Sequence, residues 1–105
     1  MKDNITVLRK APGEPWQVGT AANELQALQA AVGGYIETVT LWADAMVICD
    51  EEGRLKDYEE NCEICGVDFY GTILIAGVDG ENLVDVPADL INELAGQDGY
   101  SFLSE

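Results

Sequence analysis

The clearest pattern of apolar and polar positions lies between residues 23 and 33. Apolar residues recur there at helical spacing: Leu25, Leu28 and Val32. This spacing places them on one face of an α-helix. Asn23 and Gln26 fit a capping box at its start, and Gly33 fits a stop. The pattern predicts an amphipathic helix after Asn23.

Two pairs of short apolar segments around this helix predict β-hairpins. Residues 5–8 and 16–18 are separated by a Pro-Gly turn signal at 12–15. Residues 35–42 and 45–50 follow the helix, and the second has the unbroken apolar character of a buried strand. We expect each pair to form one antiparallel hairpin.

The second half of the chain is harder to interpret. Residues 54–67 are acidic and show no clear period, which predicts a loop. Residues 69–76 predict another strand, and Asp79-Gly80 is a two-residue hairpin signal leading into residues 82–86. The sequence therefore predicts a third hairpin after an acidic loop.

A second helix is predicted at the end of this order. Pro87 opens a segment that would bury Leu90, Ile91 and Leu94 and end near Gly96. The expected order is β-β-α-β-β-loop-β-β-α. Antiparallel hairpins with two helices packed on the sheet make an α+β fold, and we expect all 105 residues to form one domain.

Charge changes the picture more than any other feature of the composition. The chain has 20 acidic and 5 basic residues, no histidine and a net charge of -15. The basic residues all precede residue 57: Lys2, Arg9, Lys10, Arg54 and Lys56. The resulting field repels nucleic acid and anionic membranes and favours basic surfaces. We therefore expect a cationic partner protein and no direct contact with nucleic acid or membrane.

Seven of the 12 acidic residues after Lys56 are the candidate partner-binding residues: Asp57, Glu59, Glu60, Glu63, Asp85, Asp89 and Glu93. The last three recur every four residues, so they are predicted to line one face of the final helix, opposite its apolar side. Such a row, with further acidic clusters at 57–63 and 79–81, could imitate the phosphate charges of a duplex. The alternative is a solvated surface that only keeps the protein soluble.

The stretch NCEIC raises a separate question of metal or thiol chemistry. Cys62 and Cys65 form a Cys-x-x-Cys pair, and Cys49 is the one further thiol in the chain. A structural zinc site needs four ligands, and a reactive thiol needs an electropositive setting. The acidic neighbours of Cys62 and Cys65 are instead expected to disfavour the thiolate, so we treat all three cysteines as weak metal candidates. Because the number of cysteines is odd and a reducing compartment keeps thiols free, we expect no disulfide.

Motifs for catalysis are lacking in the sequence. There is no histidine base, no nucleophile elbow and no phosphate-binding glycine loop. We predict a protein that is not an enzyme and has no cofactor; a carboxylate-dependent hydrolase is the alternative. A run of about 18 apolar residues and a signal peptide are also missing, so we expect a cytoplasmic location.

Three segments carry a resemblance to a known group of proteins: VGGYIETVTL, AMVICDEEGRL and YGTILIAGVDGENLV. Across residues 30–95 the chain resembles a family of small, functionally unassigned proteins from phages and mobile elements of bacteria. The resemblance implies such an origin and a host-cytosol setting, and no activity. In similar sequences the loop carries Asn followed by Arg, whereas Cys62 follows Asn61 here, so a basic loop function is not carried over.

Together these observations favour a protein that acts by binding. The first hypothesis is an acidic phage or mobile-element protein that docks on a basic, nucleic-acid-handling host protein, as a DNA mimic that inhibits host defence of the anti-CRISPR or anti-restriction type. The second is an accessory or assembly protein that binds through apolar surface or forms homo-oligomers. The third is a cysteine-based metal module.

Overall fold

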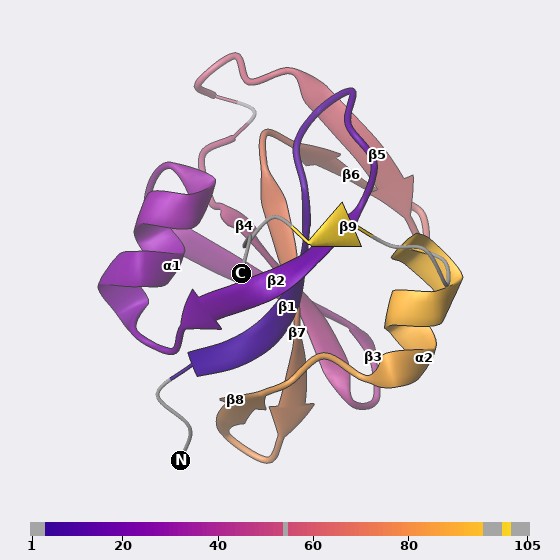
Figure 1. Cartoon of the computed structure of the whole chain (residues 1–105). Coiled ribbons are helices and arrows are strands. Elements are labelled where there is room, and N and C mark those ends of the chain that lie inside the picture. Colours follow the sequence, from indigo (N-terminus) through magenta and orange to yellow (C-terminus); the bar gives the residue numbers. More distant parts are fainter. Residues whose placement is uncertain (1–3, 54, 96–99, 102–105) are drawn as a thin grey trace.

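A twisted antiparallel sheet lies between two helices in the computed structural model (Figure 1). The structure describes residues 4–53, 55–95 and 100–101. The strands are β1 (Asn4–Lys10), β2 (Gln17–Ala22), β3 (Ile36–Trp42), β4 (Ala45–Asp50), β5 (Glu60–Ile64), β6 (Val67–Tyr70), β7 (Ile73–Asp79), β8 (Asn82–Val84) and β9 (Tyr100–Ser101). The helices are α1 (Leu25–Val32) and α2 (Ala88–Leu90), and α2 continues as the π-helix η1 (Ile91–Ala95).

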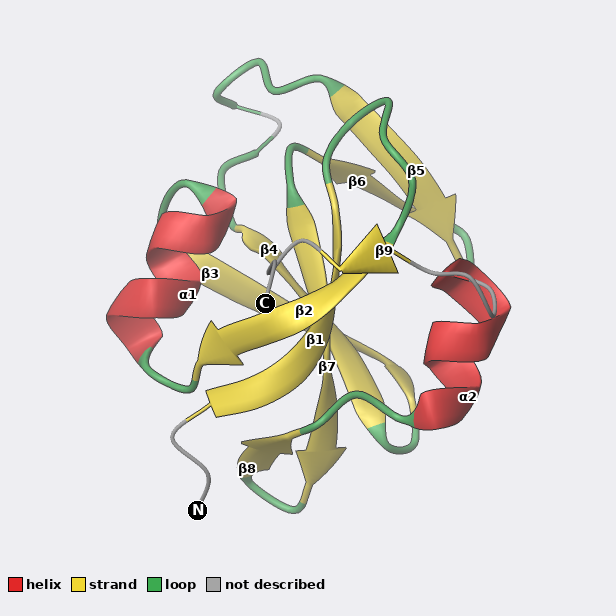
Figure 2. Cartoon of the chain, in the orientation of Figure 1, coloured by secondary structure: helices red, strands yellow, loops and turns green. Residues whose placement is uncertain are grey.

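The main sheet has the strand order β3-β4-β7-β1-β2-β9, with β8 also paired to β7. The pairs formed among β1, β2, β3, β4, β7 and β8 are all antiparallel. Strand β9 joins β2 in parallel. Strands β5 and β6 form a separate two-stranded sheet (Figure 2). In the described residues this arrangement confirms the predicted α+β class.

Strand β7 shows how the sheet separates two apolar cores. Its side chains alternate between the faces because successive residues of a strand point to opposite sides. Ile73 and Ile75 face a core that contains Leu90 of α2 and Phe69 of β6. The intervening residues Leu74 and Ala76 face a second core with the buried side of α1. Both faces of the central strands are therefore covered, which explains their unbroken apolar runs.

Helix α1 forms as predicted, but its first turn differs from the expectation. Gly33 ends the helix in the left-handed region with φ 99°, and its N–H donates to the Gln29 carbonyl at 2.8 Å. The N-cap position is Glu24, without a side-chain capping bond, so the expected capping box is wrong. Asn23 instead donates to the Leu83 carbonyl at 3.4 Å, which connects the helix start to β8. Leu25, which the helical spacing places on the same face as Leu28 and Val32, is 57% exposed.

The predictions for residues 54–76 need two corrections. The expected loop contains β5, and the expected strand at 69–76 is two strands, β6 and β7. Gly71 breaks it with φ 76°, a left-handed conformation that glycine adopts without steric cost. β6 therefore leaves the main sheet and pairs with β5.

The β7–β8 hairpin is confirmed with its turn shifted by one residue. Asp79 pairs with Asn82, so Gly80 and Glu81 are the two turn residues. Gly80 has φ 65°, which suits the first central position of a type II′ turn. The final helix begins after Pro87 and buries Leu90, as expected. Ile91 and Leu94, also expected in the core, are half-buried, and the predicted end near Gly96 lies outside the described residues.

No helix in the described part of the chain is long and apolar enough to span a membrane.

Candidate functional site

The β5–β6 hairpin is built around a tight two-residue turn. Ile64 pairs with Val67, and the residues between them, Cys65 and Gly66, have φ 52° and 83°. Two successive positive φ values are the mark of a type I′ turn, whose twist matches that of a hairpin. The turn fixes the register of the strands, so each side chain has a defined side.

One side of this hairpin packs on the main sheet. Phe69 is buried there, and the half-buried residues Cys62, Ile64 and Val67 pack against the same core. Burial raises the pKa of the Cys62 thiol, against an opposing effect of the nearby Lys10 charge. Cys62 therefore behaves as an apolar side chain of the hairpin's inner face.

The other side of the hairpin carries acidic residues, and we call it the outer hairpin face: Glu60, Glu63 and Asp68. All three are exposed. Glu63 is paired directly with Asp68 across the two strands. Like charges directly opposite each other destabilise a hairpin. Neither carboxylate forms an ion pair with a cation that the structure describes.

Two further predicted residues, Asp57 and Glu59, lie in the segment that leads into β5. Both are exposed. The Glu59 carbonyl accepts a hydrogen bond from the Gly71 N–H at 2.9 Å, which holds the end of this segment beside the break between β6 and β7. The structure thus places Asp57, Glu59, Glu60 and Glu63 in one continuous acidic segment and adds Asp68 opposite it.

Asp85 does not belong to the row that was predicted on the final helix. The helix begins at Ala88, three residues later, and Asp85 is half-buried. Its Oδ1 atom accepts a hydrogen bond from the Thr6 N–H at 2.8 Å. Asp89 and Glu93 are exposed on the helix, away from buried Leu90. The expected row of three carboxylates is therefore reduced to two.

Asn61 attaches the hairpin to the N-terminal strand. Its side-chain amide donates to the Lys10 carbonyl at 2.8 Å and to the Gly71 carbonyl at 2.7 Å. Its Oδ1 atom accepts from Lys10 Nζ at 2.8 Å. Asn61 is thus a structural residue, and it engages the Lys10 ammonium group.

A buried carboxylate lies where β4 ends and the acidic segment begins. The side chain of Asp50 is only 1% exposed. It accepts hydrogen bonds from Lys56 Nζ at 2.9 Å, Tyr58 Oη at 3.1 Å and the Glu52 N–H at 2.8 Å. Lys56 and Tyr58 also donate to the carbonyl of Gly33 at the end of α1, at 3.3 and 3.5 Å. We call this group the Asp50 cluster: Asp50, Lys56 and Tyr58.

The hydrogen bonds of this cluster decide the charge of Asp50. Burial by itself raises the pKa of Asp50, but the bonds from Lys56, Glu52 and Tyr58 outweigh it and hold the pKa below its ordinary value of 3.8. The pairing with Asp50 raises the pKa of Lys56. Asp50 is therefore a compensated buried anion that ties α1 to the acidic segment.

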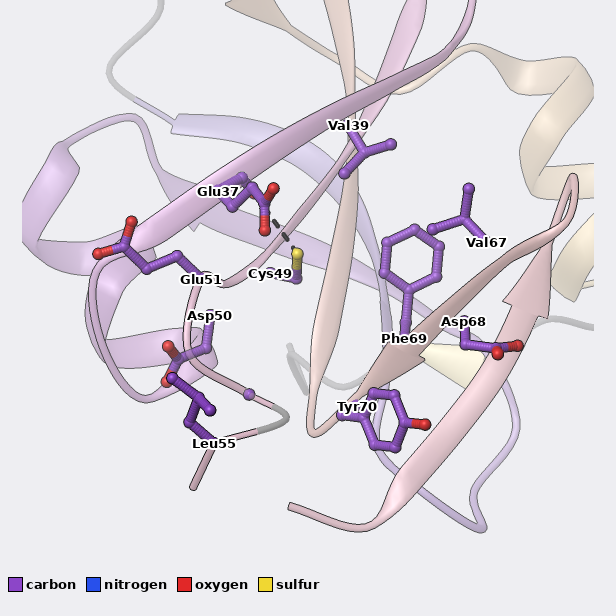
Figure 3. Close-up of a pocket in the computed structure, with 11 residues that line it drawn as sticks. Glu37, Val39, Cys49, Asp50, Glu51, Leu55, Val67, Asp68, Phe69 and Tyr70 are labelled. Atoms are coloured by element: carbon purple, nitrogen blue, oxygen red, sulfur yellow. Dashed lines mark hydrogen bonds between the residues drawn. The ribbon is translucent and has the colours of Figure 1, made fainter. Parts of the chain in front are cut away.

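A cavity of about 390 Å³ opens between β3, the end of β4 and β6 (Figure 3). Four acidic residues are among its lining: Glu37, Asp50, Glu51 and Asp68. Apolar and aromatic side chains provide the rest of the wall: Val39, Leu55, Val67, Phe69 and Tyr70. The cavity therefore combines an apolar interior with carboxylates at its border.

Cys49 lines this cavity from β4. Its Sγ atom donates to the Glu37 carbonyl at 3.6 Å. Burial, followed by the negative charges of Glu37 and Asp50, raises the pKa of Cys49 to about 11. A neutral thiol in this position is a small apolar wall group.

The three cysteines thus have separate environments. Cys49 is buried on β4, Cys62 is half-buried on the inner hairpin face and Cys65 is exposed in the turn. Among the residues that the structure describes, no group of three or more His, Cys, Asp or Glu side chains is arranged to hold a metal ion.

Sequence reasoning missed Asp68, Glu37 and the hairpin that presents Asp68. A signal was present: Cys62 and Ile64 alternate with polar residues on one side of Cys65-Gly66, and Val67 and Phe69 alternate on the other. Such alternation around a two-residue turn is typical of a hairpin. It was hidden because Cys-Gly is not among the usual turn pairs.

Comparison with known proteins gives a family. No curated protein and no solved structure matches the chain. Residues 5–98 match a family model. The match begins at the second residue of β1 and includes the other strands up to β8 and both helices. The chain therefore belongs to the family described as a domain of unknown function (DUF3846).

Proposed function

We propose that the protein acts by binding, with the outer hairpin face docking on a cationic surface of another protein. The observation that carries this proposal is the exposed Glu63–Asp68 pair. Opposed like charges destabilise a hairpin by roughly 0.2–1 kcal/mol relative to a neutral pair. A cationic partner offsets this repulsion, whereas a purely structural or solubilising role is served equally well by acids that do not face each other.

The nearby cations support the same proposal because they are already engaged. Lys10 bonds to Asn61, and Lys56 bonds to Asp50. The acidic segment therefore keeps its negative charge outward, and a net charge of -15 adds a long-range attraction for basic surfaces. Exposed Asp89 and Glu93 extend the proposed surface, while Asp85 serves the fold through its bond to Thr6.

The finer form of the proposal concerns the partner. Surfaces that bind nucleic acid are basic and are spaced to meet phosphates. A protein of phage or mobile-element origin with carboxylates in place of phosphates would compete with the duplex for such a surface on a host protein. The phage or mobile-element origin and the nucleic-acid-binding target are proposed from the sequence resemblance.

The test is affinity capture from a bacterial lysate at about 0.1 M and 0.5 M salt, two conditions that differ strongly in charge screening. The informative variant is Glu63→Gln with Asp68→Asn. The matched control is Asp79→Asn with Glu81→Gln, which also removes two exposed acids, at the β7–β8 turn on the opposite side of Figure 1.

We expect the wild type to retain a basic protein at low salt and to release it at high salt or when duplex is added. The hairpin variant should not retain this protein, whereas the control variant should. Retention that is equal for the hairpin variant and the control would reject the outer hairpin face as the binding surface. Retention that resists both salt and duplex would reject a charge-based mechanism.

A second candidate function is favoured by exposed apolar side chains. Leu25, Tyr35 and Leu55 are 57%, 70% and 82% exposed. They suit an accessory or assembly protein that self-associates or binds through apolar surface. Light scattering separates this candidate, because an apolar oligomer persists or tightens at high salt, whereas a charge-based complex dissociates.

A further inference from the structure

The cavity between β3, β4 and β6 has a composition that selects its occupant. Its volume of about 390 Å³ lies in the lower part of the range of about 300–1,000 Å³ for small-ligand sites, so one long side chain fits it. Val39, Cys49 and Phe69 line the interior, and Glu51 and Asp68 extend outward at its border in Figure 3. An occupant needs an apolar stem and a positive end.

We propose that this cavity receives an arginine side chain of the partner protein. The inference rests on the proposed function and deepens it, because it assigns one anchoring contact to a surface that is otherwise defined by charge. The aliphatic part of the arginine packs between Val39 and Phe69. Its guanidinium group pairs with the carboxylate of Glu37, which lies on β3 beside Cys49, while Glu51 and Asp68 extend outward at the border in Figure 3.

The charges at the border are available to such an occupant. Asp50 also lines the cavity, but its carboxylate is already bonded to Lys56, Tyr58 and the Glu52 N–H. Glu37, Glu51 and Asp68 are exposed, and none forms an ion pair with a described cation. Arg54, between the lining residues Gly53 and Leu55, lies outside the described residues.

Arginine suits the cavity better than lysine for two reasons. Its planar guanidinium is weakly hydrated and stacks on aromatic rings, and the rings of Phe69 and Tyr70 both line the cavity. It also carries paired N–H donors, which can bond both oxygens of one carboxylate such as that of Glu37. Lysine presents a compact, strongly hydrated charge and gains less from the rings.

The cavity also adjoins the outer hairpin face. Asp68 belongs to both, since it lines the cavity and pairs with Glu63. A partner whose basic surface covers the hairpin thus brings a neighbouring arginine to the opening. Insertion of one arginine into the cavity would fix the position and orientation of the partner, which the surface charges alone leave undefined.

The experiment is an NMR titration of the ¹⁵N-labelled chain with N-acetyl-arginine amide, with the neutral isostere N-acetyl-citrulline amide as the matched probe. Three proteins are compared: the wild type, Glu37→Gln at the cavity and Glu63→Gln on the hairpin. Each variant removes one exposed charge. N-acetyl-lysine amide tests the preference for arginine, and a deca-arginine peptide reports on the whole acidic surface.

The expected result is saturable binding of the arginine probe, with chemical-shift changes centred on Val39, Cys49 and Phe69. The affinity should be at least tenfold lower for the citrulline probe and several-fold lower for the lysine probe. Glu37→Gln should weaken binding of the arginine probe several-fold, and Glu63→Gln should leave it unchanged. Shifts spread over all exposed acids, or equal binding of citrulline, would overturn the cavity assignment. If deca-arginine then still binds in a way that depends on Glu63, the proposed function survives; if deca-arginine does not bind, both fail.

Discussion

Asp50 and the Glu63–Asp68 pair use the same chemical group in opposite ways. The Asp50 side chain is 1% exposed and receives hydrogen bonds from Lys56, Tyr58 and the Glu52 N–H. Glu63 and Asp68 are exposed and face each other without a described cation between them. A buried charge must be compensated, and an exposed one need not be. The comparison separates the acid that holds the fold from the acids available to a partner.

The two regions are also connected. The Asp50 cluster joins the end of α1 to the segment 51–59, and that segment leads directly into β5. Asn61 holds the first part of β5 against Lys10 and Gly71. The acidic hairpin is thus presented on a fixed support, which reduces the entropy lost when a partner binds.

The largest effect is expected from breaking the Asp50 cluster. Asp50→Ala removes the acceptor for two side chains and one backbone N–H, and hydrogen bonds to charged groups contribute about 1.5–3 kcal/mol each when one partner is lost. We expect the free energy of unfolding to fall by about 2–3 kcal/mol in urea titrations, since Lys56 and Tyr58 can regain water. An unchanged urea midpoint would show that the cluster does not support the fold.

Acid should remove part of the same contribution. The pKa of Asp50 is lowered in the folded protein, so its stabilisation is present above the ordinary pKa of 3.8 and is lost as the pH falls through the lower folded value. The stability gap between the wild type and Asp50→Asn should therefore narrow below about pH 4. Unfolding curves of both proteins between pH 7 and pH 2 measure this gap; a constant gap would contradict the assigned charge.

Gly71→Ala tests how closely the support is packed beside the hairpin. A Cβ atom on Gly71 would lie 2.5 Å from the Tyr58 ring, at a φ of 76° that side chains rarely adopt. The left-handed conformation alone costs about 1–2 kcal/mol. We expect a lower thermal midpoint. Gly66→Ala has a similar φ of 83° and no atom within 4 Å, so it is the control that isolates the contact with Tyr58.

Glu63→Gln with Asp68→Asn should have the smallest effect on stability, and of the opposite sign. Removing the opposed charges is expected to raise the free energy of unfolding by about 0.2–1 kcal/mol at low salt. The gain should shrink at 0.5 M salt because exposed charges are screened. A loss of stability would mean that these carboxylates make contacts within the fold.

The sequence was sufficient where one local pattern decides the structure. Helical spacing before Gly33 predicted α1, and the apolar run at 45–50 predicted the buried strand β4. Pro87 marked the start of the final helix. In these segments the periodicity of the side chains agrees with the burial that the fold imposes.

The remaining features depend on contacts between distant segments. Nothing near Asp85 in the sequence indicates that its carboxylate bonds to Thr6. The cavity is lined by Glu37, Glu51 and Asp68 from separate elements, and their spacing along the chain gives no sign of this. Periodicity reports on one element at a time, so it cannot reveal a site assembled from several.

Stability and peptide binding, measured on the same variant, test whether the outer hairpin face is arranged for a cationic partner. Wild type and Glu63→Gln with Asp68→Asn are compared by urea unfolding and by calorimetric titration with a deca-arginine peptide at about 0.1 M salt. We expect Glu63→Gln with Asp68→Asn to be at least as stable as the wild type and to bind the peptide at least tenfold more weakly, while the control Asp79→Asn with Glu81→Gln binds nearly as well as the wild type. Equal binding by all three proteins would contradict the claim that the outer hairpin face is arranged for a cationic partner.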